Sequence, residues 1–373
     1  MSSGLRTLLE ELVAIDSTST RTNLPIIEAL QKHLVALGFS CEVQRYRDDA
    51  GVEKANLIGQ LGTGLPELAL VGHSDCVPFD AAWTEALELT ERDGKLYGRG
   101  ACDTKAFIAC ALTAAQQTKG KLKKPFMLIF TADEELGCVG AKKLLEAGKG
   151  KTRRAIIGEP TSLRPIRANK GYCLAEIDIT GKEGHSAYPD TGASAIFRGA
   201  RLLTRIEKYA KGPLREQTHP DFVPAFGTLN VGMASGGKAK NVIPGQMKLT
   251  LEWRPLPNQS TEFVLKAVEQ MIEECKAEEP GFTATVRPLR MDRGYDTAAD
   301  ADVVTFLEKA SGKKTDTVSF GTEGPQLSAL GAVPVVFGPG DITVAHQTGE
   351  FVPVDELNRA AEILESAVLH FCG

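Results

Sequence analysis

Three consecutive carboxylates follow directly after an apolar run in the segment "FMLIFTADEELG"; they belong to Asp133, Glu134 and Glu135. Neighbouring acids repel one another, and the end of a buried strand is an unfavourable place for unpaired charge. One interpretation is a bound cation, with one carboxylate as its ligand and another as the base for a water molecule. The plainer interpretation is an acidic pair in the first turn of a helix, where it complements the helix dipole.

Further groups that can bind metal stand at or near the ends of other apolar runs. They are His73 and Asp75 in "ELALVGHSD", Glu159 in "RAIIGEP", and His346, which a loop separates from "VPVVFGPG"; Asp103 in "GRGACDTK" stands just before a helical segment. The carboxyl ends of parallel strands lie along one edge of a sheet, so these side chains would converge there. Imidazole nitrogens and carboxylate oxygens are ligands of zinc and similar ions. His73 and Asp75 point to one face of an extended segment, which suits a carboxylate that orients a ligating histidine.

Each of these residues also has a plainer interpretation. A lone histidine such as His73 is more often structural, Asp103 fits the N-cap of the helix that follows it, and Glu159 fits an exposed turn. His346 fits a solvated loop. Cys102 is a candidate ligand or nucleophile, but neighbours in an extended segment point apart, which favours core packing for this thiol. Two histidines and three acids together supply about the six ligand atoms that two metal ions need, which favours the metal site.

The elements that must position these residues alternate along the chain. Short apolar runs are separated by amphipathic helical segments, which predicts an α/β fold with a mostly parallel sheet and helices on both faces. From about Tyr172 the pattern changes to the polar–apolar alternation of half-exposed strands, in the order strand–helix–strand–strand–helix–strand. We therefore expect a catalytic domain formed by residues 1–172 and 289–373, interrupted at 173–288 by a ferredoxin-like domain.

Composition limits the classes of partner. The chain has 373 residues, 42% hydrophobic and 24% charged, and its net charge of -5 gives no reason to expect nucleic acid or an anionic membrane. The first 17 residues predict an amphipathic helix with Leu5, Leu8, Leu9 and Leu12 on one face, without the features of a signal peptide. Eight cysteines without CxxC pairing predict free, buried thiols. We expect a cytoplasmic protein that acts on a small molecule.

Five motifs, in order, resemble those of a known group: "GHSDCVP", "GRGACDTK", "TADEELG", "GEPT" and "AHQTGEF". The chain resembles, over nearly its whole length, the metallopeptidase superfamily that contains acetylornithine deacetylase, succinyl-diaminopimelate desuccinylase and related carboxypeptidases. The resemblance implies two divalent metal ions, with zinc expected and cobalt the alternative. It implies that His73 and Glu159 bind one ion, Glu135 and His346 the other, and that Asp103 bridges them. It also implies that Glu134, rather than Asp133, is the general base for a hydroxide that bridges the metals, with Asp75 behind His73.

The resemblance extends to the inserted domain, a lid and dimerisation domain in this superfamily. The segment "GKEGHSAYPDTGASAI" implies that His185 reaches the active site of the partner subunit in a homodimer and stabilises the developing oxyanion. Asn241 and Arg254 would contact a substrate carboxylate, since a guanidinium suits bidentate recognition. Thr322 and Glu323 would lie at the rim of the pocket. The plainer interpretations are a histidine in a turn, a turn cap and a surface ion pair.

The segment "RPLP" and the ending "FGPGDITVAHQTGEFVPVDEL" are more similar to acetylornithine deacetylases than to desuccinylases. We therefore expect hydrolysis of N-acetyl-L-ornithine to L-ornithine and acetate, a step of arginine biosynthesis. Succinyl-diaminopimelate, N-acetylcitrulline and the substrates of aminoacylases or dipeptidases are the alternatives. A catalytically silent, metal-binding scaffold protein is a further alternative, but such a protein is expected to lack the base or a ligand, and here each of those positions is filled.

Overall fold

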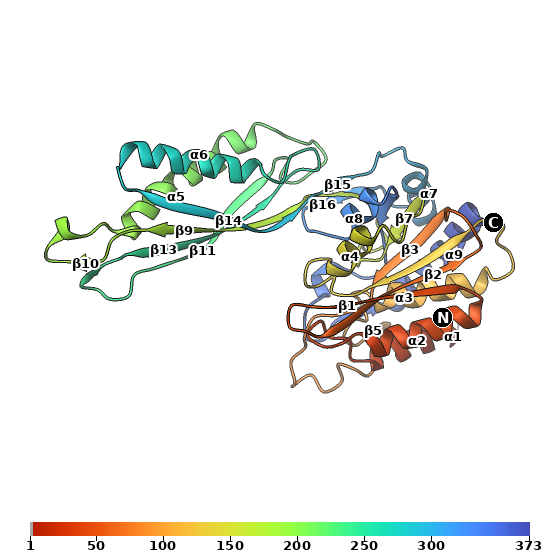
Figure 1. The fold of residues 1–373 in the computed structure, drawn as a ribbon. Helices are drawn as coiled ribbons and strands as arrows, with labels where there is room; N and C mark the ends of the chain where they lie inside the picture. Colours follow the sequence, from red (N-terminus) through yellow and green to blue (C-terminus); the bar gives the residue numbers. More distant parts are fainter. Residues whose placement is uncertain (1–2) are drawn as a thin grey trace. The chain divides into compact units, whose positions relative to one another are not determined.

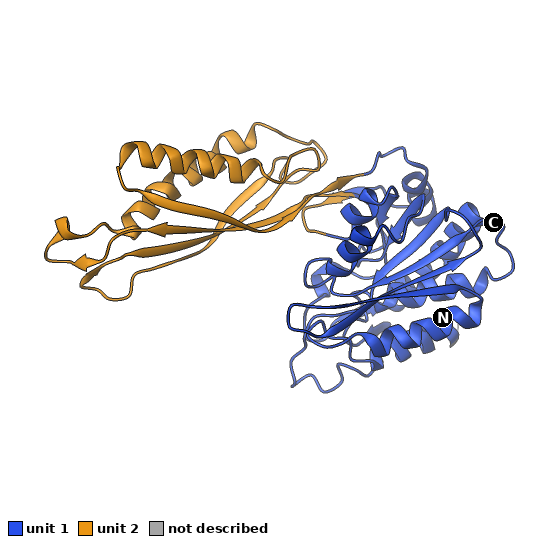
Figure 2. Ribbon diagram, in the orientation of Figure 1, with its two compact units in different colours: residues 1–167, 297–316, 322–373 blue, residues 168–296, 317–321 orange. Residues whose placement is uncertain are grey.

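The computed structural model describes residues 3–373, and the chain divides into two compact units (Figure 2). Unit 1 comprises the chain up to Arg167 together with Thr297–Asp316 and Thr322–Gly373. Unit 2 comprises Ala168–Asp296 and Thr317–Gly321. Within the described residues, no helix is both long and apolar enough to cross a membrane.

The largest sheet has the strand order β1-β2-β6-β3-β7-β17-β8-β15, and β16 pairs with β8 (Figure 1). Its strands are β1 (Ser40–Arg47), β2 (Glu53–Leu61), β3 (Leu68–His73), β6 (Phe126–Thr131), β7 (Arg154–Ile157), β8 (Ile166–Asn169), β15 (Tyr295–Asp296), β16 (Asp316–Val318) and β17 (Val333–Val336). All residues of β3 and β6 are buried, as expected for strands covered on both faces.

The expected α/β class is confirmed, but the parallel part of the sheet is confined to its centre. Strands β6, β3, β7 and β17 are parallel neighbours, whereas β1–β2, β2–β6 and β17–β8 pair antiparallel. The link between β1 and β2, residues 48–52, is too short for the crossover that a parallel pair requires, so these two strands form a hairpin.

Helices surround this sheet and supply most of the core of unit 1. They are α1 (Ser3–Ala14), α2 (Leu24–Leu37), α3 (Lys105–Gln117), α4 (Val139–Ala147), α7 (Asp302–Ser311), α8 (Gly324–Ala329) and α9 (Val354–Cys372). Helix α3 packs against α1 and α9, while α4 packs against α8. The predicted apolar face of α1 is confirmed, since Leu5, Leu9 and Leu12 are buried and Leu8 packs against the same core. A separate small sheet in unit 1 is formed by β4 (Thr90–Arg92), β5 (Lys95–Tyr97) and β18 (Phe351–Pro353).

Unit 2 has the predicted ferredoxin-like order of elements. These are β9 (Tyr172–Thr180), α5 (Ala195–Lys211), β11 (Thr228–Gly236), β13 (Gln246–Arg254), α6 (Phe263–Glu278) and β14 (Thr283–Asp292), in an antiparallel sheet ordered β11-β13-β9-β14. Figure 1 shows α5 and α6 on the same face of this sheet. Alternate residues of β9 and β13 are buried under the two helices, which explains the alternation in their sequences.

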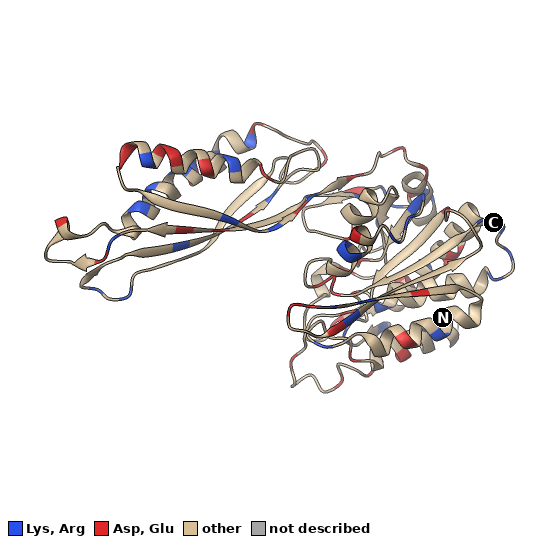
Figure 3. Ribbon diagram, in the orientation of Figure 1, with Lys and Arg blue, Asp and Glu red and all other residues tan. Residues whose placement is uncertain are grey.

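Charged residues of both signs are interspersed along the chain in each unit (Figure 3). On α5 and α6, for example, Arg205 pairs with Glu278 at 2.5 Å. Such exposed pairs contribute little to stability, so the fold rests on its cores rather than on surface charge.

Candidate active site

The register of the central strands brings the candidate ligands together. His73 at the end of β3 pairs with Thr131 at the end of β6, so the residues that follow these strands lie side by side. Ile157 of β7 pairs with Val71, which places Glu159 just beyond the same edge. Residues from three separate segments therefore meet at the carboxyl ends of parallel strands, where α/β folds bind ligands.

Two overlapping groups of atoms that could hold a metal ion occur here among the described residues. His73, Glu134 and Glu159 form one, and His73, Asp103 and Glu135 form the other, with the ligand atoms of each group within 4.8 Å of one another. The Asp103 carboxylate lies between two imidazoles: Oδ1 is 2.9 Å from His73 Nε2, and Oδ2 is 3.2 Å from His346 Nε2. His346 Nε2 is also 3.0 Å from Glu135 Oε2. All five expected ligands thus belong to one cluster that includes Glu134.

The plainer interpretations of these residues do not describe the structure. The N-cap position of α3 is Thr104, and the Asp103 carboxylate faces the imidazoles instead. Helix α4 begins at Val139, beyond Glu134 and Glu135, so these acids do not occupy its first turn. Glu159 is buried, and the His346 side chain, though half exposed, lies against two carboxylates. Cys102 is the exception, because its buried thiol donates to the Asp341 carbonyl oxygen at 3.6 Å, as core packing requires.

The electrostatics of the cluster favour a cation. Burial raises the pKa of Asp75 to about 6 and that of Glu134 to about 8, and the neighbouring carboxylates add to both shifts. Burial, together with Asp103 and Glu134, likewise holds the pKa of Glu159 well above its usual range. Burial alone would raise the pKa of Asp103, but hydrogen bonds from His346 and His73 outweigh it and lower that pKa. Because its acids outnumber its imidazoles, this donor set fits divalent metal ions such as zinc.

Asp75 orients both His73 and the acidic turn, that is, the turn formed by Asp133, Glu134 and Glu135. His73 Nδ1 donates to the backbone oxygen of Asp75 at 2.9 Å, which leaves Nε2 free to coordinate a metal. The Asp75 carboxylate, 3.7 Å from Nδ1, instead accepts the backbone N–H groups of Glu134 at 3.1 Å and Glu135 at 3.3 Å. The histidine is therefore fixed by the main chain of Asp75, and the turn is fixed by its side chain.

Glu350 is a functional residue that sequence reasoning missed, although it lies inside the motif "AHQTGEF". Its Oε1 accepts the backbone N–H groups of Cys102 and Asp103, both at 2.9 Å. Its Oε2 pairs with Arg99 Nη1 at 2.6 Å, and both side chains are almost fully buried. The carboxylate thereby fixes the backbone that presents Asp103 to the two imidazoles.

Glu350→Gln is expected to weaken metal affinity and kcat by about 10- to 100-fold, the usual cost of losing a group that orients a metal ligand. The amide cannot both accept the two N–H groups and neutralise the buried Arg99 guanidinium. Metal titration by calorimetry and steady-state kinetics measure the two effects. Glu362→Gln, which alters an exposed pair with Arg359, is the matched control and is expected to behave as the wild type. Wild-type metal affinity in Glu350→Gln contradicts the role.

In unit 2 the expected substrate residues occupy two separate places. His185 on β10 (Gly184–His185) is exposed and pairs with Val242 of β12 (Val242–Ile243), so it lies beside Asn241. The His185 Nδ1 accepts the Ala187 N–H at 3.1 Å, which leaves Nε2 as a donor. Figure 1 shows β10 beyond one end of the sheet, whereas Arg254 ends β13 at the other. The two ends of strand β13, which has 9 residues, are about 26 Å apart, and this length separates the two places.

Arg254 is held by neighbours within unit 2. Its guanidinium lies over the Tyr172 ring at 4.2 Å, its Nε donates to Glu252 Oε1 at 2.6 Å, and its Nη1 donates to the Ser319 carbonyl oxygen at 3.3 Å. This arrangement fixes the plane of the guanidinium, as recognition of a carboxylate requires.

Thr322 and Glu323 belong to unit 1 and are buried rather than exposed at a rim. The Glu323 carboxylate is almost fully buried, with the Thr131 hydroxyl as a neighbouring donor. Burial raises the pKa of Glu323 to about 7.

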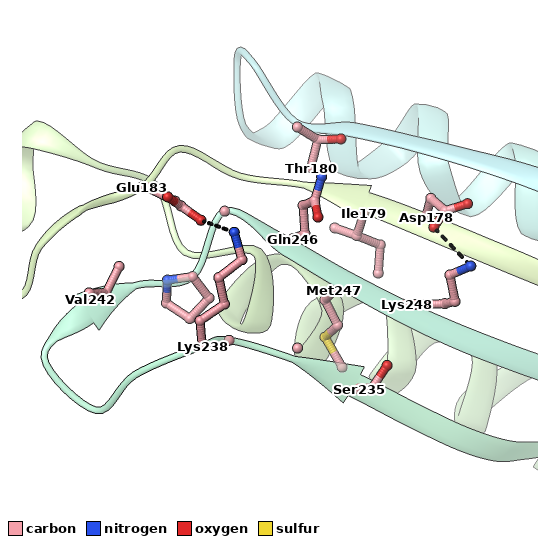
Figure 4. Close-up of a pocket in the computed structure, with 14 residues that line it drawn as sticks. Asp178, Ile179, Thr180, Glu183, Ser235, Lys238, Val242, Gln246, Met247 and Lys248 are labelled. Atoms are coloured by element: carbon pink, nitrogen blue, oxygen red, sulfur yellow. Dashed lines mark hydrogen bonds and ion pairs between the residues drawn. The ribbon is translucent and has the colours of Figure 1, made fainter.

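A polar cavity of about 390 Å³ lies in unit 2 and is distinct from these residues (Figure 4). Its charges satisfy one another: Lys238 pairs with Glu183 at 3.1 Å, and Lys248 with Asp178 at 3.7 Å. None of the site residues expected from the sequence is among its lining residues, so it adds nothing to the candidate active site.

Comparison with known proteins places the cluster in context. The chain is 60% identical, over 373 residues covering 99% of it and 98% of the relative, to an acetylornithine deacetylase of Myxococcus xanthus. It is 35% identical to an acetylornithine deacetylase of Proteus mirabilis (strain HI4320), over 96% of this chain and 93% of that one.

The fold is shared with solved structures of lower sequence identity. The aminopeptidase PepT from Bacillus cereus ATCC 10987 superposes with a TM-score of 0.79 at 23% identity, covering 99% of this chain and 98% of that one. The model of peptidase family M20/M25/M40 matches residues 69–370. That match spans both units and every residue of the metal-binding cluster, and the chain therefore belongs to peptidase family M20/M25/M40.

Proposed function

We propose that the chain is a metal-dependent amide hydrolase that converts N-acetyl-L-ornithine to L-ornithine and acetate, a step of arginine biosynthesis. The observation that carries the proposal is the cluster in which two imidazoles and four carboxylates meet at one sheet edge. Its chemistry is that of a dinuclear hydrolase, and the 60% identical relative from Myxococcus xanthus supports the choice of substrate.

Five side chains would hold two divalent ions, for which zinc is the expected metal and cobalt the alternative. His73 and Glu159 would bind one ion, Glu135 and His346 the other, and Asp103 would bind both. When bound, the ions would polarise the amide carbonyl and make a water molecule more acidic.

Glu134 would act as the general base and then as the general acid. Its carboxylate would take a proton from the attacking water and return it to the nitrogen of the leaving amine. Burial raises the pKa of Glu134 in the metal-free protein, which is the direction expected of a carboxylate that must also hold a proton during the reaction. Asp75 supports this role, because its carboxylate accepts the backbone N–H of Glu134 and so fixes the position of the base.

His185 would act across a homodimer. Its exposed Nε2–H is a donor that can stabilise a developing oxyanion. His185 and Asn241 lie beyond one end of the unit 2 sheet and Arg254 lies at the other, so a single copy of unit 2 does not present all three to one substrate. We therefore assign His185 and Asn241 to the partner's active site, and Arg254, Thr322 and Glu323 to substrate contacts in their own. The residues 173–288 would thus serve as a lid and dimerisation domain between catalytic segments 1–172 and 289–373.

A panel of substrates tests the proposal on metal-reconstituted protein. We expect kcat/KM for N-acetyl-L-ornithine to exceed that for N-succinyl-diaminopimelate by at least about 100-fold, since a pocket built for one acyl amino acid leaves buried polar groups unpaired with the other. N-acetylcitrulline and an uncharged N-acetyl amino acid complete the panel, and released amine is measured. A clear preference for succinyl-diaminopimelate overturns the substrate. Two bound ions without turnover of any acyl amino acid overturn the catalytic function.

A further inference from the structure

Asp133, the first of the three acids, faces away from the metal-binding cluster. Its Oδ1 accepts a hydrogen bond from Lys54 Nζ at 2.8 Å, and its Oδ2 accepts one from the Tyr46 hydroxyl at 2.9 Å. Lys54 Nζ also donates to the Ser19 carbonyl oxygen at 2.6 Å and lies 3.8 Å from Asp48. The side chains of Lys54 and Asp133 are each only 1% exposed, so this is a fully buried ion pair.

The ion pair holds one end of the acidic turn. Asp133 has a φ of 54°, in the left-handed region that a residue with a side chain rarely adopts without support. Its backbone oxygen accepts the Val139 N–H at 3.0 Å, and the Glu134 oxygen accepts the N–H groups of Gly137 and Cys138. The conformation of Asp133 therefore sets the direction in which Glu134 and Glu135 leave the strand.

Strand β2 holds the turn at two more points. Asn56 is two residues from Lys54, so both side chains leave β2 on the same face. Asn56 Oδ1 accepts the Ala132 N–H at 3.0 Å, and Asn56 Nδ2 donates to the Gly140 carbonyl oxygen at 2.9 Å. A Cβ at Gly140 would lie only 2.4 Å from both Asn56 Oδ1 and the Ala132 oxygen, so the two segments are in close contact.

The charge of Lys54 has a further effect. The cluster on the other side of the turn already contains the four carboxylates of Asp103, Glu134, Glu135 and Glu159, and that of Asp75 lies beside it. An additional buried carboxylate without a counter-charge would repel them, and it would itself be costly. The Lys54 ammonium neutralises Asp133, so this acid can anchor the turn without adding to the charge that the metal ions must balance.

We propose that Lys54 is a positioning residue for the reaction: through Asp133 it holds the left-handed turn that directs Glu134 and Glu135 into the metal-binding cluster. This inference rests on the proposed function for its kinetic consequence, but its effect on metal binding is independent of the substrate.

Lys54→Met tests the inference on protein reconstituted with cobalt(II). We expect kcat to fall by about 10- to 100-fold and cobalt affinity to fall by a similar factor, because the Asp133 carboxylate is left buried without its partner and the turn relaxes. KM is expected to change by less than about 3-fold, since Lys54 touches no proposed substrate residue. The visible absorption of bound cobalt(II) reports the altered ligand geometry directly.

A double variant separates positioning from general destabilisation. In Lys54→Met/Asp133→Asn neither position of the buried pair carries an unpaired charge, and an asparagine can still accept from the Tyr46 hydroxyl and adopt the left-handed conformation, so cobalt affinity and kcat are expected to recover to within a few-fold of the wild type. Lys143→Met, which alters an exposed pair with Glu146 at 2.8 Å, is the matched control and should leave all readouts unchanged. A Lys54→Met protein with wild-type kcat and cobalt spectrum, and only a lower melting temperature, overturns the inference.

Tyr46→Phe keeps the test decisive if Lys54→Met does not fold. It removes one donor from Asp133 and leaves the ion pair in place, so we expect a several-fold loss of cobalt affinity and kcat with an unchanged KM. Wild-type values of both in a folded Tyr46→Phe protein would show that the anchoring of Asp133 does not set the geometry of the cluster, and would thereby overturn the inference. The cobalt spectrum distinguishes this outcome from failure of the proposed function, since it reports the turn whatever the substrate is.

Discussion

Glu134→Gln is expected to lower kcat by about 10³- to 10⁴-fold while the protein still binds two metal ions. Glutamine keeps the shape of the side chain and one oxygen, but it cannot take a proton from water or return it to the leaving amine. The Asp75 carboxylate accepts the backbone N–H of residue 134, and this contact does not depend on the side chain. Steady-state kinetics with N-acetyl-L-ornithine and metal analysis of the purified variant measure the two quantities.

The matched control is Glu146→Gln, an exposed glutamate that pairs with Lys143 on the nearby helix α4. It changes the same functional group without approaching the cluster and is expected to keep wild-type kcat. Near-normal turnover in Glu134→Gln would falsify the role of this residue. Loss of metal in that variant would instead identify Glu134 as a ligand, consistent with its position within 4.8 Å of His73 and Glu159 atoms.

Removal of metal by chelation is expected to abolish activity and to make stability fall as the pH rises. In the stripped protein the pKa of Asp75 is about 6 and that of Glu134 about 8, both above the ordinary values of these acids, because burial disfavours their charged forms. The folded state then binds protons more tightly than the unfolded state. Its stability is greatest below the ordinary pKa and is lost as the pH rises through the folded values.

The free energy of unfolding of the stripped protein should therefore decrease between about pH 5 and 8, by a few kcal/mol, since one unit of pKa is worth about 1.4 kcal/mol. His346 acts in the same direction, because hydrogen bonds from its imidazole to Asp103 and Glu135 raise its pKa to about 10. Asp103 acts oppositely, but only below its ordinary pKa, where its contribution to stability is lost as the pH falls toward the lowered folded value. Urea unfolding at several pH values, with and without added zinc, measures the effect. Zinc should remove the decrease, and stripped protein that gains stability over this range contradicts the prediction.

The positions of the metal-binding residues could be predicted because strand ends carry the information. His73, Glu135 and Glu159 each follow a buried apolar run, and parallel strands align their carboxyl ends whatever the details of the helices. The choice of Glu134 over Asp133 as the base stays a prediction, and it rests on the resemblance of the motifs rather than on the spacing of the residues. The ferredoxin-like unit could be predicted for a similar reason, since its alternating strands and two amphipathic helices have few ways to pack.

The contacts that support these residues could not be predicted, because they depend on pairings over long sequence separations. Lys54 and Asp133 are 79 residues apart, and Arg99 and Glu350 are 251 apart. A sequence pattern does not show that Asp133 adopts a positive φ and turns its carboxylate away from its neighbours. Nor does it show that the backbone of Asp75, rather than its carboxylate, accepts the hydrogen bond from His73.

The antiparallel flanks of the main sheet were missed for a different reason. The strands β2 and β6 are both largely buried, and burial on both faces does not distinguish a parallel from an antiparallel neighbour. The short link between β1 and β2 is a sequence feature that indicates an antiparallel pair, whereas the general alternation of strands and helices favours parallel strands.

The unequal burial of the two histidines makes the two cation positions unequal. The His73 side chain is 1% exposed, whereas that of His346 is 50% exposed and belongs to a loop rather than to a strand end. In the proposed centre, an ion on the His346 side would exchange with solvent through movement of one loop, while an ion on the His73 side would leave only if the sheet edge opened. Loading of such a centre would therefore be sequential, and a scarce supply of metal would yield singly loaded molecules before any are complete.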